Sequence, residues 1–238
     1  MKTLREIPFN FEQKGHRTLL LALLTLLLVN PFFQHYDTFQ WLLAVFLTMV
    51  LLAAVRTVAS RVRQYRLALV LAVLAVAPQF GVLIERSEWL ETVRYLAMMS
   101  FLFWVCALLL RNIIVRSHTV TTDLILGAIN IYLMMGVAFA FMFGLIEHLQ
   151  PGSYTGLGES MLALDPVFPF LYFSFITLTT LGYGDITPIT SFGMTAAYTE
   201  AMFGQLYLAI LVARLVGLYI GRRGVTEKNK EHSESEHR

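Results

Sequence analysis

Long runs of apolar residues with almost no charge restrict what this chain can fold into. Of its 238 residues, 57% are hydrophobic and 14% are charged, whereas a soluble domain contains about 25% charged residues. A soluble core of this size has no need for such runs, but a helix that crosses a bilayer needs about 20 apolar residues. The sequence therefore predicts an all-α membrane protein that crosses the membrane several times.

The apolar runs form six segments: Thr18–Phe33, Phe39–Val55, Leu67–Ile84, Tyr95–Val115, Leu124–His148 and Met194–Ile220. The first is short for a full crossing and contains Asn30-Pro31, but local thinning of the bilayer can accommodate a short span. Only Gln34–Thr38 separates the first two segments. This connection predicts a tight antiparallel pair of helices.

Lys and Arg are distributed unevenly between the two sides that these six segments define. Of the 18 Lys and Arg residues, 16 fall on the side that holds both ends of the chain, and only Arg86 and Arg94 fall on the other. Cytoplasmic loops carry the excess of Lys and Arg, so we expect both termini in the cytoplasm and the protein in the cell membrane. Met1–Arg17 has no short apolar core before a cleavage site, so no removable signal peptide is expected.

Several functional classes are disfavoured by composition. The net charge of +2 is too small to indicate a nucleic-acid partner. The single cysteine, Cys106, lies in an apolar run and is expected to be a small buried residue. The sequence contains no acid/base pair, metal-ligand cluster or nucleophile in a plausible site, so an enzyme is not expected.

The segment Leu149–Gly193 departs from the pattern, because it is too long for a simple turn and is itself partly apolar. Asp165-Pro166 predicts a helix start, with Asp as the N-cap and Pro at the first helical position. The apolar run Val167–Leu178 that follows is too short to cross a membrane. Non-helical backbone at membrane depth is tolerated only where protein surrounds it or where it lines a watery path. We therefore expect a re-entrant helix here.

Directly after this run comes Thr179-Thr180-Leu181-Gly182-Tyr183-Gly184-Asp185. Removing water from a potassium ion requires protein oxygens in its place, and successive backbone carbonyls directed at one axis supply them. That alignment requires alternating backbone conformations, some at positive φ, which Gly182 and Gly184 adopt without a Cβ penalty. The Thr180 hydroxyl adds an oxygen at the inner end. One chain supplies too few oxygens to surround an ion, so four chains must converge.

The segment from about Leu124 to Gly221 resembles the pore of the tetrameric potassium channel superfamily: outer helix, pore helix, filter and inner helix. The filter of that family is known, and Leu181 stands where its common form has Val. The resemblance implies a homotetramer in membrane lipid that passes K⁺ through a filter made of Thr180, Leu181, Gly182, Tyr183 and Gly184. It also implies that Thr180, Leu181, Gly182 and Tyr183 bind the permeant K⁺, with no other cofactor. A Gly-rich surface turn is the alternative interpretation.

The resemblance assigns supporting residues around the filter. Tyr172 and Phe173 are expected to brace it from behind, with Tyr172 either hydrogen-bonded to Asp185 or merely packed. Thr179 flanks the filter. Glu200 lies about 140° around its helix from Gln205, given about 100° per residue. We therefore expect it to face the pore helix and to form a structural hydrogen bond there, to Thr177 or Thr179.

The last apolar segment carries the residues that the resemblance assigns to the cavity and the gate. Gly204 falls where the family has its hinge glycine, and Ala209 falls slightly more than one turn further along. A glycine inside a helix costs about 0.5–1 kcal/mol relative to Ala, so it tends to have a reason. Close helix packing is the alternative reason for Gly204. Gln205 and Leu208 are expected to face the cavity.

Six spans with the pore last are similar to the layout of voltage-gated channels. The fourth segment lacks their arginine at every third position, since Arg94, Arg111 and Arg116 lie near its ends, where long side chains reach the headgroups. We expect a cytoplasmic segment (1–17), a four-helix scaffold (18–118), a pore domain (119–221) and a mobile polar tail (222–238).

The expected function is a potassium channel that is not steeply voltage-gated. The alternatives are a voltage-gated channel with a reduced sensor, a potassium transporter subunit or a non-conducting membrane sensor. The sequence leaves the gating stimulus open. A leak, a response to lipid or tension, and control by a separate regulatory protein are all compatible with it.

Overall fold

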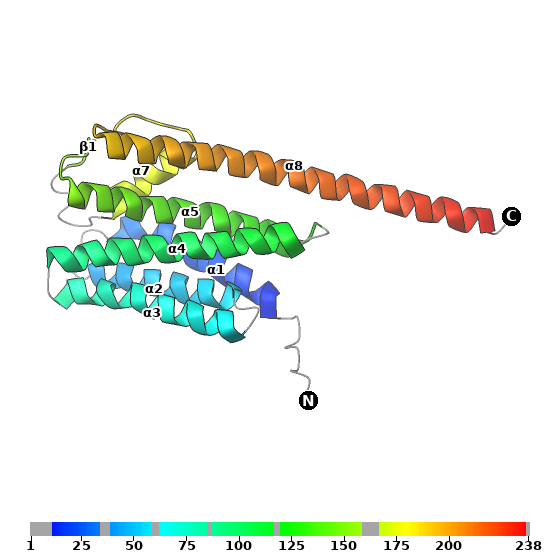
Figure 1. Ribbon diagram of the computed structural model, residues 1–238, viewed down its shortest axis with the longest axis horizontal. Helices are drawn as coiled ribbons and strands as arrows, with labels where there is room; N and C mark the ends of the chain where they lie inside the picture. Colours follow the sequence, from blue (N-terminus) through cyan, green and yellow to red (C-terminus); the bar gives the residue numbers. More distant parts are fainter. Residues whose placement is uncertain are drawn as a thin grey trace.

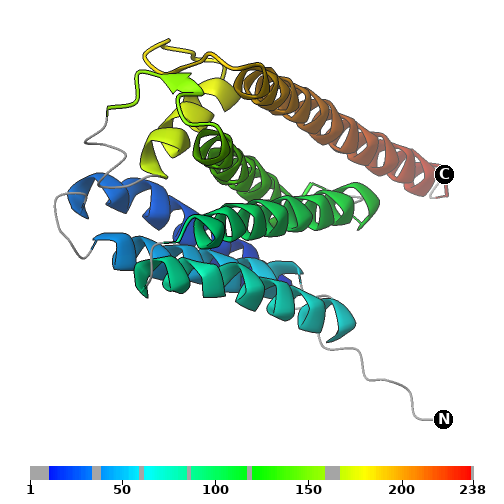
Figure 2. The same ribbon diagram turned by 60° about the vertical axis from the view of Figure 1, so that its left-hand side comes forward.

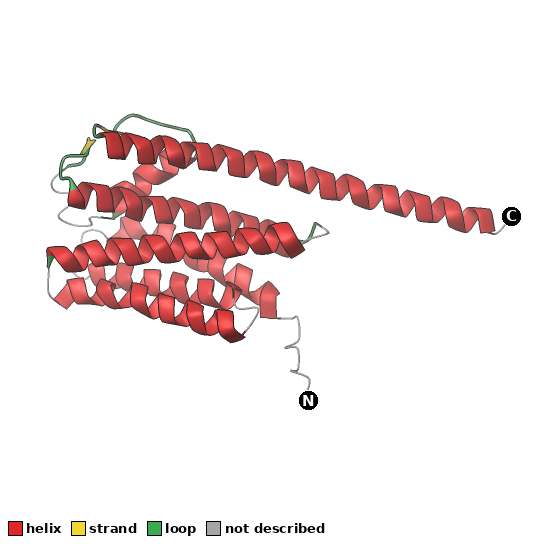
Figure 3. Cartoon of the chain, in the orientation of Figure 1, coloured by secondary structure: helices red, strands yellow, loops and turns green. Residues whose placement is uncertain are grey.

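A computed structural model describes residues 11–33, 39–58, 62–84, 87–116, 120–158 and 167–236. These ranges are almost entirely helical (Figure 3). The helices are α1 (Phe11–Phe33), α2 (Phe39–Val58), α3 (Val62–Ile84), α4 (Glu88–Arg116), α5 (Thr122–Leu149), α7 (Phe168–Leu178) and α8 (Ser191–Glu236). Two short strands, β1 (Tyr154–Thr155) and β2 (Thr187–Pro188), pair antiparallel. The prediction of an all-α protein is confirmed for these ranges.

Each of the six apolar segments falls within one helix of the structure, and the short run before the filter forms α7 except for its first residue, Val167. The connection Gln34–Thr38 and the expected helix start at Asp165-Pro166 lie outside the described residues. In the structure, Val167 is the residue before the first turn of α7, and Pro169 lies within that turn, where its missing N–H leaves no hydrogen bond unmade.

The residues after Ile220 are helical, which the sequence analysis did not predict. Helix α8 continues without interruption to Glu236, and Figure 1 shows its last turns extending well beyond the other helices. The sequence of this extension contains no proline, and it is rich in Arg, Lys and Glu, which have high helix propensity. Gly221 and Gly224 are possible helix ends directly after the apolar segment, but the helix continues through both of them.

Three helices of the described residues are long and apolar enough to cross a membrane: Glu88–Ile114, Thr122–Leu149 and Ser191–Leu218. The apolar parts of the first three helices are shorter, and they run over Gly15–Val29, Ala44–Val55 and Arg66–Val82. Length and apolar composition thus indicate a membrane protein, with α4, α5 and the first part of α8 as its candidate spans.

Helix α5 is the centre of the molecule. In the most apolar 18-residue stretch of α5, 72% is buried inside the protein. The corresponding shares are 44% for α4 and 6% for α8. It packs against α1 and α4 on one side and against α7 and α8 on the other (Figure 2). Thr121 begins the helix, because its hydroxyl accepts the Leu124 N–H at 3.2 Å. The chain can therefore be divided into α1–α4, the central α5, and the segment from α7 to α8.

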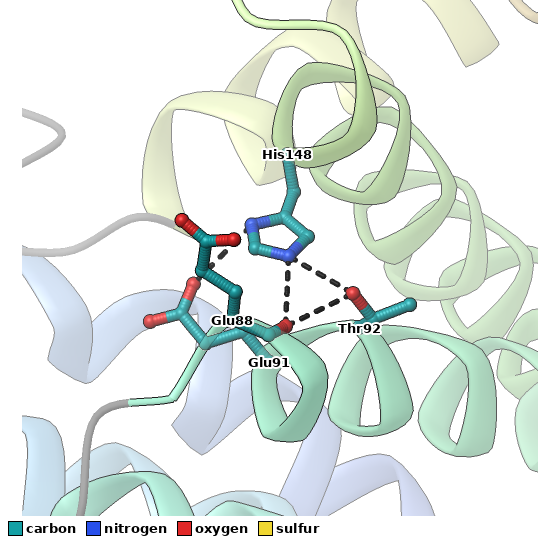
Figure 4. A network of polar contacts seen from close by, with 4 residues as sticks. All are labelled: Glu88, Glu91, Thr92 and His148. Carbon is teal, nitrogen blue, oxygen red and sulfur yellow. Dashed lines mark hydrogen bonds and ion pairs between the residues drawn. The ribbon is translucent and has the colours of Figure 1, made fainter.

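Polar contacts fix α4 at both of its ends. At its start, His148 of α5 lies 3.5 Å from a Glu91 carboxylate oxygen, 3.0 Å from the Thr92 hydroxyl and 3.1 Å from the Glu88 carbonyl oxygen (Figure 4). At its other end, Arg214 of α8 donates to the carbonyl oxygens of the last turn, Ile113 and Ile114, each at 2.8 Å. Helix α4 is thus attached to both helices that flank the predicted filter.

The expectation that Arg94 reaches the headgroups is wrong. Its side chain is only 7% exposed, and its guanidinium carbon lies 4.7 Å from the centre of the Tyr95 ring. The aromatic face partly compensates the buried positive charge. Arg111, by contrast, is exposed.

Candidate functional site

The loop after α7 folds back onto the end of that helix. The Thr180 N–H donates to the Thr177 carbonyl at 2.9 Å. The N–H groups of Leu181 and Gly182 both donate to the Ile176 carbonyl, at 2.9 and 3.1 Å. These three bonds use carbonyls that a helix end leaves without a partner inside the helix. The position of the loop is therefore set by α7.

Positive and negative φ angles alternate along this loop. The values are +58° at Thr180, +54° at Gly182 and +79° at Gly184, and the intervening Leu181 and Tyr183 have negative φ. An added Cβ at either glycine would have nothing within 4 Å. Within the single chain, the loop therefore requires glycine there for its backbone conformation and not for lack of space. The expected alternation is present.

The positive φ of Thr180 was not predicted. A left-handed conformation costs a non-glycine residue about 1–2 kcal/mol, so other contacts must hold it. Besides its N–H bond to Thr177, the Thr180 hydroxyl accepts a hydrogen bond from Gln205 of α8 at 3.2 Å. Sequence reasoning had no signal for this conformation, because threonine normally avoids it.

One aromatic side chain of α7, Tyr172, contacts the loop, whereas its neighbour Phe173 packs against α5 and β1. Tyr172 donates its hydroxyl to an Asp185 carboxylate oxygen at 2.6 Å, so of the two interpretations of Tyr172 the hydrogen bond is confirmed. This bond lowers the pKa of Asp185 below its ordinary value. The neighbouring Phe173 is buried, and its ring centre lies 4.8 Å from that of Phe143 in α5 and 5.5 Å from that of Tyr154 in β1.

The two-stranded sheet fixes the outer end of the loop, and sequence reasoning missed this contribution. Thr155 pairs with Thr187, and their hydroxyl oxygens lie 2.6 Å apart. The next residue, Gly156, has a φ of +83°, and an added Cβ would lie 1.8 Å from the Asp185 carbonyl oxygen. No side chain fits between them. The only sequence signal was a glycine in a turn-rich loop, with nothing to link it to Asp185.

The inner helix contributes Gly204 and Gln205 to the site. An added Cβ at Gly204 would lie 2.5 Å from the Leu178 carbonyl oxygen, and that oxygen also accepts a hydrogen bond from Tyr132 of α5 at 3.2 Å. This geometry supports close packing as the reason for Gly204, while the hinge role stays a prediction. Leu208 and Ala209 lie further along α8 and are exposed in the single chain.

The predicted partner of Glu200 is wrong, although its direction is right. Glu200 faces α7 and lies 2.5 Å from the Ser174 hydroxyl, not beside Thr177 or Thr179. The Thr179 hydroxyl instead donates to the Phe175 carbonyl at 2.7 Å. Ser174 lies one turn before Thr177 on the same face of α7, so the helices meet one turn further from the filter than expected.

Comparison with known proteins places this site in context. A protein-family model described as "Ion channel" matches residues 129–220, which run from α5 into α8 and include the whole loop. Protein LctB of Bacillus caldotenax is 30% identical over 126 residues, which are 49% of this chain and 93% of LctB. The chain belongs to this ion-channel family. No solved structure matches this ion channel.

Two plant proteins are also similar to parts of this ion channel. Two pore potassium channel c of Oryza sativa subsp. japonica is 35% identical over 85 residues, which are 36% of this chain and 16% of the plant protein. Two-pore potassium channel 5 of Arabidopsis thaliana is 33% identical over 86 residues, which are 18% of its length. The match to these plant proteins is thus confined to a short part of each.

Proposed function

We propose that this protein is a potassium-selective channel of the pore-loop superfamily, through which K⁺ passes passively. The observation that carries the proposal is the alternation of φ over Thr180–Gly184 in a loop anchored at the end of a short helix. In a filter of this type, carbonyl oxygens replace the hydration shell of K⁺. The proposed ligands are the carbonyls of Thr180, Leu181, Gly182 and Tyr183, together with the Thr180 hydroxyl. The names of the plant relatives support K⁺ as the ion.

The proposed assembly is a homotetramer. In a single chain, Leu181 and Tyr183 are 56% and 68% exposed, and the apolar part of α8 is almost wholly uncovered. Family members generally assemble as oligomers in membranes. Contacts with three further copies would cover these surfaces, and the four loops together would supply enough oxygens around one axis.

The proposed topology has six spans, with both termini in the cytoplasm of a cell-membrane protein. The domains are 1–17, the scaffold 18–118, the pore domain 119–221 and the C-terminal segment 222–238. Helices α1–α3 are the weakest part of this topology, because their apolar stretches are short. The uneven distribution of Lys and Arg in the sequence supports the orientation.

Voltage should change the open probability only weakly. Steep gating moves about 3–4 charges per subunit across the membrane field, but Arg94 is buried near the start of α4 and Arg111 and Arg116 lie near its end. A conductance–voltage curve measured between strongly negative and strongly positive potentials tests this. A steep curve that flattens in Arg111→Gln or Arg116→Gln would show instead a voltage-gated channel with a reduced sensor.

Single-channel recording of the purified protein in a lipid bilayer tests the proposed class of function. A channel gives discrete unitary currents, a transporter subunit carries ions too slowly for them, and a non-conducting sensor gives neither current nor flux. The single filter loop per chain favours the channel. Continuous K⁺ uptake by vesicles without unitary currents would favour the transporter.

A further inference from the structure

The buried face of α8 consists of small residues and one acid. Among the α8 residues whose side chains are described, the buried ones are Gly193, Ala196, Glu200 and Gly204. Their spacing of three or four residues places them in one stripe, and Gly204 and Glu200 both contact α7. Glu200 is 0% exposed. It is the one long side chain of the stripe.

A glutamate buried this completely requires compensation if it is ionised. Within the described ranges, Glu200 has no ion-pair partner, and its Oε2 has no hydrogen-bond partner. The titratable groups that interact with it from the neighbouring elements are Tyr132 of α5 and Tyr154 of β1. Neither is a cation. The surroundings therefore disfavour a carboxylate.

The number of protons available at Ser174 indicates whether Glu200 is ionised or protonated. The Ser174 hydroxyl oxygen lies 2.6 Å from the Gly136 carbonyl oxygen and 2.5 Å from Glu200 Oε1. A serine hydroxyl has one proton to donate, and a carbonyl oxygen only accepts. If Glu200 were ionised, two acceptors would compete for that proton, and one short oxygen–oxygen contact would have no hydrogen in it. Both contacts are hydrogen bonds only if Glu200 supplies the second proton.

We propose that Glu200 is protonated and uncharged, and that it is a positioning residue for the filter. Its Oε1–H donates to Ser174, and Ser174 donates to Gly136, so one chain of hydrogen bonds joins α8, α7 and α5. The end of helix α7 anchors the filter loop. The series of hydrogen bonds therefore holds in place the helix that positions the filter. The effect on conduction rests on the proposed function, but the protonation state does not.

Gly136, whose carbonyl accepts the last of these hydrogen bonds, is suited to this position. An added Cβ there would lie 2.9 Å from Cζ of Phe175, so the missing side chain lets α7 come close to α5. At that separation the Ser174 hydroxyl reaches the main chain of α5. The glycine therefore allows the short contact on which the proton count depends.

Infrared spectroscopy of the full chain in lipid at neutral pH tests the protonation state. The carbonyl band of a protonated carboxylic acid, which shifts in D₂O, should be lost in Glu200→Gln and changed in position in Ser174→Ala. Glu147→Gln is the matched control. The Glu147 carboxylate accepts the N–H groups of Gly152 and Ser153 at 2.7 and 2.8 Å, so it is an acceptor whose removal should leave the band intact. A band unchanged in Glu200→Gln would overturn the proposal.

Comparison of Glu200→Gln with Glu200→Leu tests the positioning role. The glutamine amide still donates to Ser174, whereas leucine has a similar size but no donor. Glu200→Gln should retain most of the K⁺ current and of the thermal stability of the oligomer, and Glu200→Leu should lose most of both. Equal behaviour of the two variants would overturn the role. If the unmodified protein does not conduct, the proposed function fails, while the band and the melting temperature still decide this inference.

Discussion

Replacing Gly182 with Ala should abolish the potassium current or its selectivity. The φ of +54° at Gly182 would cost alanine about 1–2 kcal/mol in each subunit. Nothing in the same chain lies within 4 Å of the added Cβ, so within one subunit the substitution acts on the backbone and not through a clash. The loop can relieve the strain by rotating the adjoining peptide, which moves a carbonyl oxygen away from the ion. Currents in K⁺ and in Na⁺ measure the effect.

Gly152→Ala is the matched control for this prediction. Gly152 has a φ of +82°, and an added Cβ there also has nothing within 4 Å, but the residue lies in the loop before β1. It should therefore suffer comparable strain and leave ion selectivity unchanged. If Gly182→Ala stays as potassium-selective as Gly152→Ala, Thr180–Gly184 is not the filter.

Replacing Gly204 with Ala should destabilise the assembly and strongly reduce its current. The added Cβ would lie 2.5 Å from the Leu178 carbonyl oxygen and 2.9 Å from Cδ1 of Leu178. The oxygen belongs to the backbone at the end of α7, so the helix must move. Overpacking of this kind costs about 1–3 kcal/mol, here in every subunit. The melting temperature of the oligomer and the K⁺ flux into vesicles measure the loss.

Gly217→Ala is the control in the same helix, because within the single chain an added Cβ at Gly217 has nothing within 4 Å and so lacks the contact that Gly204 makes with Leu178. It should behave like the unmodified protein in both measurements. If Gly204→Ala matches Gly217→Ala in stability and flux, the close approach to Leu178 is unimportant. If Gly204→Ala changes only the open probability and keeps stability and selectivity, the hinge interpretation is correct and the packing interpretation is wrong.

The local features of the site could be predicted from the sequence, because each depends on residues that lie close together in the chain. The short apolar run before Thr179 predicted α7, and the spacing of Gly182 and Gly184 predicted the alternation of φ. The bond from Tyr172 to Asp185 was one of two interpretations left open. The spacing of residues within such a short segment is enough to suggest features of this kind.

Contacts between segments that are distant in the sequence could not be predicted in this way. The approach of Gly156 to Asp185 depends on the pairing of β1 with β2, and the Glu200–Ser174 contact depends on the register between α8 and α7. A register shift of one turn leaves the apolar pattern of both helices almost unchanged, which is why Thr177 and Thr179 looked equally suitable. The helical extension of α8 was missed for another reason: polar composition indicates exposure to water, but it does not exclude a helix.

The central claim, that Thr180–Gly184 selects potassium, is tested most directly by the reversal potential of the unmodified protein. The purified protein is placed in a lipid bilayer with K⁺ on one side and Na⁺ at equal concentration on the other. We predict a reversal potential displaced far from zero, in the direction that shows K⁺ to be much the more permeant ion. A reversal potential near zero, which indicates equal permeability to both ions, would contradict the claim.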